Sequence, residues 1–220
     1  MFGKNPKRAP ETGDGSTLQI VEIFPTLQGE GPFAGHPAVF VRLGGCNLAC
    51  DFCDTEFEDF RAMDLVSVVA EVKKLAEKRI DLVVITGGEP LRQNIAPLCE
   101  ALLAEGLRVQ IETNGTLWRP LPEGVNVVCS PKVTDGKYHP LRPDLLARVD
   151  ALKFIVSAES GEYHAVGEVG QSGTNIPVYV QPMDQYDAAK NAANTAHALA
   201  LAQQNGYRLS LQMHKMLGIA

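Results

Sequence analysis

Short runs of β-branched and aliphatic residues recur along the chain, and most of them are apolar on both faces. They are AVFVRL (38–43), LVVIT (82–86), RVQIE (108–112), VNVVCS (125–130), LKFIVS (152–157), PVYVQ (177–181) and RLSLQ (208–212). Strands of this kind are typical of a parallel sheet that is covered on each side. We therefore predict parallel strands at these positions, with the last run as an extra strand at the edge.

Three segments between these runs show the spacing of amphipathic helices. The first begins at about Asp64 and places Leu65, Val68, Val72 and Leu75 on one face. The other two cover roughly residues 92–105 and 187–205. Six core strands with only three full helices predict an α/β fold, a partial parallel βα barrel that is open and has a reduced number of helices.

The first residues of the chain differ in composition from the rest. Residues 1–16 combine Gly, Pro and charge with almost no large apolar side chain, which predicts a mobile N-terminal leader. Residues 17–220 show no internal repeat and no low-complexity tract, so we expect a single core domain there. With 45% hydrophobic and 21% charged residues, a chain of 220 residues is long enough to bury such a core.

Charge and hydropathy exclude several classes of partner. The formal net charge of -6 disfavours a protein that binds nucleic acid, because such domains usually carry a basic excess on one face. No apolar run approaches the roughly 18 residues that span a membrane, and the N-terminus lacks the hydrophobic segment of a signal peptide. We expect a cytoplasmic protein, in which thiols stay reduced and clustered cysteines indicate metal binding or catalysis.

Three of the five cysteines lie within eight positions, in the stretch GGCNLACDFCDTEF. Cys46, Cys50 and Cys53 form a CxxxCxxC pattern directly after an apolar strand. A zinc site would need a fourth protein ligand or a water, and His36, His139 and His214 are candidates without the close pairing of zinc ribbons. Core packing would not gather three thiols in a loop flanked by Gly and Asp. An iron–sulfur cluster fits better, since three thiolates leave one iron open for a substrate or cofactor.

A second motif, TGGEP (86–90), follows some thirty residues after the cysteines. Gly87 and Gly88 at a strand end allow close approach of a ligand to the backbone, although an ordinary turn has the same appearance. The strands before ETNGT (112–116), SPK (130–132), QPMD (181–184) and LQMHK (211–215) also end in polar residues. In a parallel barrel these ends open on one face, where active sites are built.

The cysteine motif and TGGEP together resemble the radical S-adenosylmethionine superfamily. That resemblance implies a 4Fe-4S cluster whose open iron binds S-adenosylmethionine, which is cleaved to a 5′-deoxyadenosyl radical. FPTLQGEGPFAG (24–35), VRLGGCNLACDFCDT (41–55), ETNGT, SPK, VQPMD and the closing LQMHKMLGIA further resemble the 7-carboxy-7-deazaguanine synthase family, over residues 18–220. This implies magnesium-dependent conversion of 6-carboxy-5,6,7,8-tetrahydropterin to 7-carboxy-7-deazaguanine, with loss of ammonia.

The resemblance also implies a role for individual residues. Cys46, Cys50 and Cys53 would bind the cluster, and Thr55 would offer its hydroxyl to Mg²⁺. The positions that match substrate contacts are Leu27, Gln28, Gly29, Glu30, Arg42, Thr86, His214 and the terminal Ala220. The positions that match S-adenosylmethionine contacts are Phe52, Cys53, Asp54, Gly88, Glu89, Ser130, Pro131, Lys132, Gln181, Pro182, Met183 and Asp184. Within this set, Arg42 is expected to pair with the anionic substrate, and Glu89 with the methionyl ammonium.

Some features depart from the family pattern or leave alternatives open. Met213 stands where a small polar residue is expected and Ala220 where proline is usual, while Cys99 and Cys129 are expected in the core. The alternatives are an activase of the same superfamily that makes glycyl radicals, or a non-catalytic zinc or electron-transfer module. The family implies a homodimer and a flavodoxin or ferredoxin as electron donor.

Overall fold

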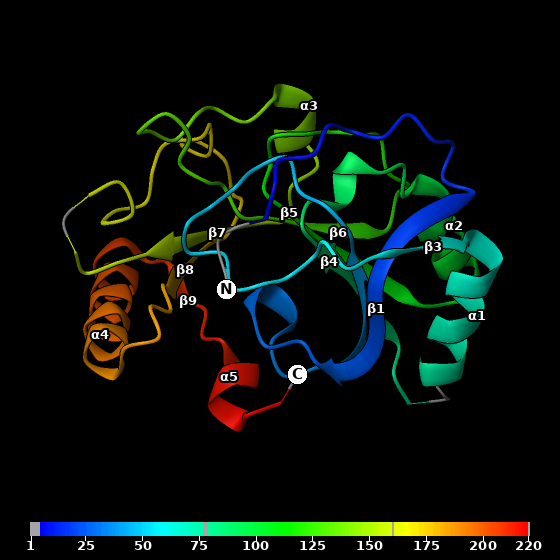
Figure 1. The fold of residues 1–220 in the computed structure, drawn as a ribbon. Helices are drawn as coiled ribbons and strands as arrows, with labels where there is room; N and C mark the ends of the chain where they lie inside the picture. Colours follow the sequence, from blue (N-terminus) through cyan, green and yellow to red (C-terminus); the bar gives the residue numbers. More distant parts are fainter. Residues whose placement is uncertain (1–4, 77–78, 160, 220) are drawn as a thin grey trace.

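A computed structural model describes residues 5–76, 79–159 and 161–219, and its centre is one sheet (Figure 1). The strands are β1 (Thr17–Leu27), β2 (Pro37–Leu43), β3 (Arg61–Asp64), β4 (Leu82–Gly87), β5 (Arg108–Thr113), β6 (Val125–Cys129), β7 (Ala151–Val156), β8 (Val178–Pro182) and β9 (Arg208–Leu209). Their order in the sheet is β3-β1-β2-β4-β5-β6-β7-β8-β9. From β2 to β9 all pairs are parallel, so the carboxyl ends of these strands lie along one edge. The predicted partial βα barrel is confirmed.

Two antiparallel strands at one end of the sheet are absent from the prediction. β1 pairs with β2 from Ile20 to Leu27 and with β3 only from Thr17 to Ile20. Pro25 therefore lies where β1 has one neighbour, and its missing N–H costs no ladder bond. The proline and the alternation of polar and apolar residues hide this strand from a search for uniformly apolar runs.

Alternation along the parallel strands divides their side chains between two environments. One face carries the main core, to which Val41, Ile85, Ile111, Val127 and Phe154 belong, each fully buried. The other face carries two small apolar clusters, one of Ala38, Leu82 and Val84 and one of Val128, Ala151 and Tyr179, together with polar side chains such as Glu112 and Lys153. Because side chains alternate along each strand, the main core and the polar side chains lie on opposite faces of the sheet.

Helices cover the main core on the sheet's outer face. These are α1 (Leu65–Ala76), α2 (Ala96–Ala104), α3 (Pro143–Leu146) and α4 (Ala188–Asn205), and the short α5 (Met213–Leu217) lies near the C-terminus (Figure 1). Asp187 caps α4 by accepting a hydrogen bond from Lys190 N at 2.9 Å. Gly206, in the left-handed region with φ 69°, ends α4.

The predicted helix over 92–105 begins later than expected. Pro90–Arg92 instead form a 3₁₀ turn, η2, whose N-cap Glu89 accepts a hydrogen bond from Leu91 N. The side chains of Arg92 and Gln93 are almost fully buried and bond to Gly44 and to β1, which a surface helix would not allow. A second 3₁₀ turn, η1, covers Gly31–Phe33.

The described part of the predicted leader has fixed contacts in the structure. Arg8 N donates to Cys46 O at 2.7 Å, and its guanidinium pairs with Glu58 at 2.5 Å. Glu11 pairs with Arg92 at 2.7 Å. Charged residues that look solvated in the sequence therefore have partners far along the chain, and this holds within residues 5–16. Residues 1–4 of the predicted leader lie outside the described residues.

Candidate active site

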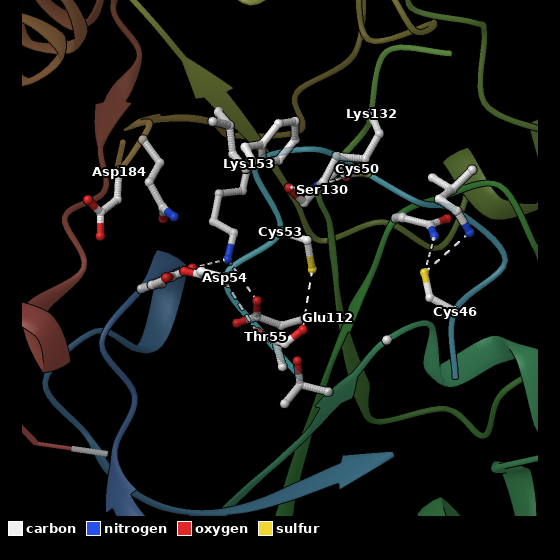
Figure 2. A pocket seen from close by; sticks show the side chains of 18 of the residues that line it. Cys46, Cys50, Cys53, Asp54, Thr55, Glu112, Ser130, Lys132, Lys153 and Asp184 are labelled. Atoms are coloured by element: carbon white, nitrogen blue, oxygen red, sulfur yellow. Dashed lines mark hydrogen bonds and ion pairs between the residues drawn. The ribbon is translucent and has the colours of Figure 1, made fainter. Parts of the chain in front are cut away.

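The carboxyl ends of the parallel strands line a cavity of about 200 Å³. Figure 2 shows the cysteine loop on one side of this cavity and the side chains of Glu112 and Lys153 facing it. Its lining includes Cys46, Cys50, Cys53, Thr55, Thr86, Gly88, Ser130, Lys132, Gln181 and Asp184. The five sequence motifs that follow strands are thus brought together, as expected for one rim of a parallel barrel.

The cysteine loop leaves β2 through two glycines that lie close against neighbouring side chains. Gly45 has φ 76°, and a Cβ at Gly44 would collide with the ring of Phe60. Gly45 O accepts a hydrogen bond from Glu89 N at 3.0 Å, which ties the loop to the TGGEP turn. The local fold therefore holds the cysteines directly beside the second motif.

The donor set around the cysteines fits a cluster of iron and sulfur. Cys46 Sγ accepts from Leu48 N at 3.4 Å and from Asn114 Nδ2 at 3.8 Å, and such donors stabilise a cluster-bound thiolate. Burial raises the pKa of Cys46 to about 11 and also raises the pKa values of Cys50 and Cys53, so the metal must supply the positive charge that keeps these thiolates ionised. A further, small hollow is lined by the same three cysteines, with Asn5 and Phe57.

Among the described residues, no group of three or more His, Cys, Asp or Glu side chains converges on a single metal-ion position. A 4Fe-4S cluster makes no such demand, because each thiolate binds a different iron. Cys99 and Cys129 are fully buried in the main core, as predicted.

A second cavity of about 340 Å³ adjoins the first and shares Glu30, Thr55, Thr86 and Glu112 with it. Its lining includes Leu27, Gln28, Glu30, Arg42, Thr86 and His214, six of the eight positions predicted to contact substrate. Gly29 is not among the lining residues, and Ala220 lies outside the described residues.

The LQGEG turn and the C-terminal segment touch directly at this second cavity. Met213 N donates to Gly29 O at 3.1 Å. A Cβ at Gly29 would lie 3.0 Å from His214 N and closer still to its ring nitrogen Nδ1, so glycine is required for this approach. Motifs nearly two hundred residues apart therefore form one wall.

A buried charged cluster between the cavities was missed by the sequence reasoning. Lys153 on β7 has a side chain only 4% exposed, and its Nζ contacts Glu30 and lies 2.7 Å from Glu112 Oε2. Glu112 Oε1 accepts from Gln28 Nε2 at 2.9 Å, and Glu30 Oε1 accepts from Gln212 Nε2 at 2.9 Å. A signal was available for Lys153, which is the one charged residue of the otherwise apolar strand β7.

Electrostatics in this cluster favour its ionised state. Burial works against charge on Glu30, but Lys153 and Gln212 stabilise the carboxylate and lower its pKa to about 2. Burial likewise works against the Lys153 ammonium, yet the charges of Glu112 and Glu30 raise its pKa above the ordinary value. Two carboxylates and one ammonium leave one negative charge in a largely buried site.

Arg42 has a protein partner in addition to its place in the second cavity. Its Nε donates to Glu22 Oε1 at 2.6 Å, and the guanidinium lies over the ring of Phe24 at 5.6 Å. Glu22 therefore provides an anionic partner for Arg42 within the protein. The Arg42 side chain is 21% exposed, so it is not fully buried.

Glu89 makes hydrogen bonds within the protein. Its carboxylate is fully buried and accepts from Leu91 N, Thr113 Oγ1 and Asn114 N at 2.9, 2.8 and 2.7 Å. It is absent from the lining of the first cavity, as is Pro131. These donors let Glu89 fix the turn after β4 to the end of β5, and its contact with a methionyl ammonium stays a prediction.

The remaining positions predicted for the cofactor line the first cavity. Phe52, Cys53, Asp54, Gly88, Ser130, Lys132, Gln181, Pro182, Met183 and Asp184 are all among its lining residues. Lys132 Nζ donates to Ser130 Oγ at 2.7 Å, while burial lowers the pKa of this lysine.

Comparison with known proteins agrees with this geometry. The model of the radical SAM superfamily matches residues 40–128, which include the cysteine loop and the TGGEP turn. The 7-carboxy-7-deazaguanine synthase of Rickettsia prowazekii is 55% identical over 100% of this chain and 96% of its own length. The chain belongs to the 7-carboxy-7-deazaguanine synthase family. The family resemblance predicted from the motifs is confirmed.

Further relatives extend the match across the whole chain. The 7-carboxy-7-deazaguanine synthase of Rhodospirillum rubrum is 46% identical, with 100% of both chains covered. Among solved structures, QueE from Escherichia coli superposes with a TM-score of 0.69 at 26% identity, covering 92% of this chain and 99% of that one. Streptococcus suis SuiB with its precursor peptide SuiA has a TM-score of 0.51 at 16% identity, over 76% of this chain and 46% of SuiB, and so shares the fold. Within the described residues, no helix combines the length and apolarity needed to cross a membrane.

Proposed function

We infer that this protein is a radical S-adenosylmethionine enzyme that converts 6-carboxy-5,6,7,8-tetrahydropterin to 7-carboxy-7-deazaguanine, with radical ring contraction and loss of ammonia. The observation that carries this inference is the adjacency of two cavities, one lined by three cysteines and the other by the LQGEG turn and the C-terminal segment. The family named for this product supports the same reaction.

Cys46, Cys50 and Cys53 would hold the 4Fe-4S cluster, and the polar residues of the first cavity would bind S-adenosylmethionine beside it. When bound, the cluster and S-adenosylmethionine together supply a 5′-deoxyadenosyl radical. The chain's own contribution is orientation and exclusion of water. Leu48, Phe57, Ile155 and Met183 give the cavity apolar walls, which suits a reaction that must exclude competing hydrogen donors.

Thr55 is the proposed protein ligand of Mg²⁺. Its side-chain Oγ1 donates to Asp54 Oδ1 at 3.2 Å, which leaves its lone pairs for a cation. Thr55 lines both cavities, so a cation there would lie between cofactor and substrate. Magnesium accepts few protein ligands and takes the remainder from water and from a substrate carboxylate.

The substrate would occupy the second cavity. Glu30 and Gln28 offer a carboxylate and an amide to the guanidine-like edge of a pterin, and Lys153 with Glu112 adds donors and acceptors beside them. Arg42 and His214 place nitrogen donors on the same wall, where a substrate carboxylate would compete with Glu22 for the guanidinium. Leu27, Gly29, Thr86 and the terminal Ala220 complete the proposed contacts.

The proposed setting is a cytoplasmic homodimer reduced by a flavodoxin or ferredoxin, without nucleic-acid or membrane partners. The experiment that tests the function is anaerobic reconstitution with iron and sulfide, followed by reduction with S-adenosylmethionine, Mg²⁺ and the carboxytetrahydropterin. We expect a brown protein that forms 5′-deoxyadenosine and a deazaguanine acid seen by mass spectrometry. A colourless protein with one zinc would overturn the proposal, and 5′-deoxyadenosine without the acid would favour a glycyl-radical activase.

A further inference from the structure

The C-terminal helix α5 is held to the rest of the protein by polar contacts. None of its residues, Met213–Leu217, all within the described part of the chain, is buried. Met216 and Leu217 are 72% and 57% exposed, so their side chains contribute little apolar packing. A helix without a buried face depends on hydrogen bonds and ion pairs for its position.

Lys215 makes the two ion pairs of this helix. Its Nζ lies 2.6 Å from Asp54 Oδ2 and 2.8 Å from Asp184 Oδ2, and 5.6 Å from the centre of the Tyr186 ring. The side chain is 29% exposed, so these pairs are partly shielded from solvent. One ammonium thus joins three segments that are far apart in sequence.

Each partner of Lys215 is fixed by a further contact. Asp54 lies between Cys53 and Thr55, and its other oxygen, Oδ1, accepts the Thr55 hydroxyl at 3.2 Å. Asp184 follows β8, and its Oδ1 accepts from Asn191 Nδ2 on α4 at 2.7 Å. The Lys215 ammonium therefore links the wall that carries His214 to the loop that carries the cysteines.

We propose that Lys215 is a positioning residue that couples closure of α5 over the second cavity to the order of the Cys53–Thr55 loop. In the closed arrangement, Lys215 neutralises the two aspartates and holds the Asp54 carboxylate against the Thr55 hydroxyl. Without this ammonium, α5 loses its charged contacts and the loop loses its tie to the C-terminal segment. The coupling rests on contacts in the cofactor-free chain; only its effect on turnover rests on the proposed function.

Hydrogen–deuterium exchange of the cofactor-free protein tests the coupling directly. In Lys215→Met we expect exchange to rise on the order of fivefold in peptides covering both 211–219 and 50–56, since two partly exposed ion pairs are lost. Lys215→Arg should restore most of the protection. Lys190→Met is the matched control, because Lys190 forms a similar lysine–carboxylate pair with Glu159 at 2.9 Å outside both cavities.

Ionic strength distinguishes an ion pair from simple packing. Added salt should raise exchange of peptide 211–219 in the wild type and leave it nearly constant in Lys215→Met, because salt screens partly exposed charges. If peptide 50–56 of Lys215→Met exchanged at the wild-type rate, the coupling would be overturned, even if exchange of peptide 211–219 increased.

Steady-state kinetics then connects the coupling to the reaction. In Lys215→Met we expect KM for the carboxytetrahydropterin to rise on the order of tenfold, with a smaller change in kcat, because the closed wall is less populated. An unchanged KM would contradict the proposed effect on the cavity. If the wild type itself fails to convert the pterin, the proposed function is wrong, while the exchange measurements still decide the role of Lys215.

Discussion

Glu112 Oε2 lies 2.7 Å from Lys153 Nζ across the inner face of the sheet, although the strands that carry them, β5 and β7, are separated by β6. The intervening strand β6 ends at Cys129, one residue after Val128, which is the register partner of Glu112. Glu30 reaches the same ammonium from the LQGEG turn. The charge balance of the second cavity thus depends on one lysine that serves two carboxylates.

Replacement of Lys153 by methionine is expected to destabilise the protein by about 3–5 kcal/mol, because two largely buried carboxylates lose their counter-charge. Urea denaturation of the cofactor-free protein measures this effect. The double variant Lys153→Met with Glu112→Gln keeps the net charge of the cluster and should recover a large part of the loss. Equal destabilisation in the single and double variants would contradict a charge-based role. Lys74→Met, an exposed lysine on α1, is the control.

The same cluster predicts a dependence of stability on acid pH. Lys153 and Gln212 outweigh the opposing effect of burial and lower the pKa of Glu30 from 4.5 to about 2, so the folded state binds this proton more weakly than the unfolded chain. The resulting stabilisation is fully present above about pH 4.5 and is lost as the pH falls towards about 2. In Lys153→Met the pKa of Glu30 should rise, so its contribution to stability and the loss of that contribution in acid should both become smaller. Urea midpoints measured across this pH range for both proteins would show the shift, and parallel curves would refute it.

Replacement of any one of Cys46, Cys50 and Cys53 by alanine should abolish the brown cluster in the reconstituted protein. Cys99→Ser should keep wild-type iron and lose only about 1–3 kcal/mol of stability, because its thiol is fully buried in the main core. Iron and sulfide analysis after anaerobic reconstitution measures the first effect and urea denaturation the second. Similar iron loss in Cys99→Ser would mean that the three-cysteine assignment is wrong.

Uniformly apolar runs were sufficient to predict the parallel strands, because these strands are covered on both faces. They were insufficient for β1, where Pro25 and alternating polarity mark a strand with one neighbour over most of its length. The start of α2 was misplaced because Arg92 and Gln93 look like surface residues but bond to Gly44 in the interior. Their partners lie some fifty residues away, beyond any local pattern.

The residues of the candidate site also fall into two groups, those that a sequence motif indicates and those that it does not. Motif residues such as Cys46, Thr86 and His214 were found because they follow strands or match a family. Lys153 belongs to no motif, and Glu112 enters only as the first residue of ETNGT, without a role of its own. The alternation of β5 and β7 puts both on the inner face. Lys215 was quoted within the C-terminal motif, but its two aspartate partners depend on how α5 docks.

Thr55→Ala should raise the Mg²⁺ concentration needed for half-maximal activity on the order of tenfold or more, since one of few protein ligands is removed. Thr55→Ser keeps the hydroxyl and should stay close to the wild type. Cleavage of S-adenosylmethionine without substrate should respond less than turnover, because the proposed ion lies on the substrate side. A magnesium titration of both reactions checks this, and an unchanged titration in Thr55→Ala would remove the residue from the metal site.

Gly29→Ala tests whether the LQGEG turn and the C-terminal segment form one wall. An added Cβ would lie 3.0 Å from His214 N, and one of the two segments must move. Because α5 has no buried residue, we expect α5 to move instead of the sheet. The free energy of unfolding in urea should therefore change by less than about 1 kcal/mol, while exchange of peptide 211–219 and KM for the pterin both increase.

Gly13→Ala provides the control, since a Cβ there meets no atom within 4 Å. It should leave stability, exchange and KM at wild-type values. If Gly29→Ala behaved like this control, His214 would not lie against the LQGEG turn in solution, and the second cavity would lack its C-terminal wall. A large loss of global stability in Gly29→Ala would instead show that the strain enters β1, whose last residue, Leu27, is two positions away.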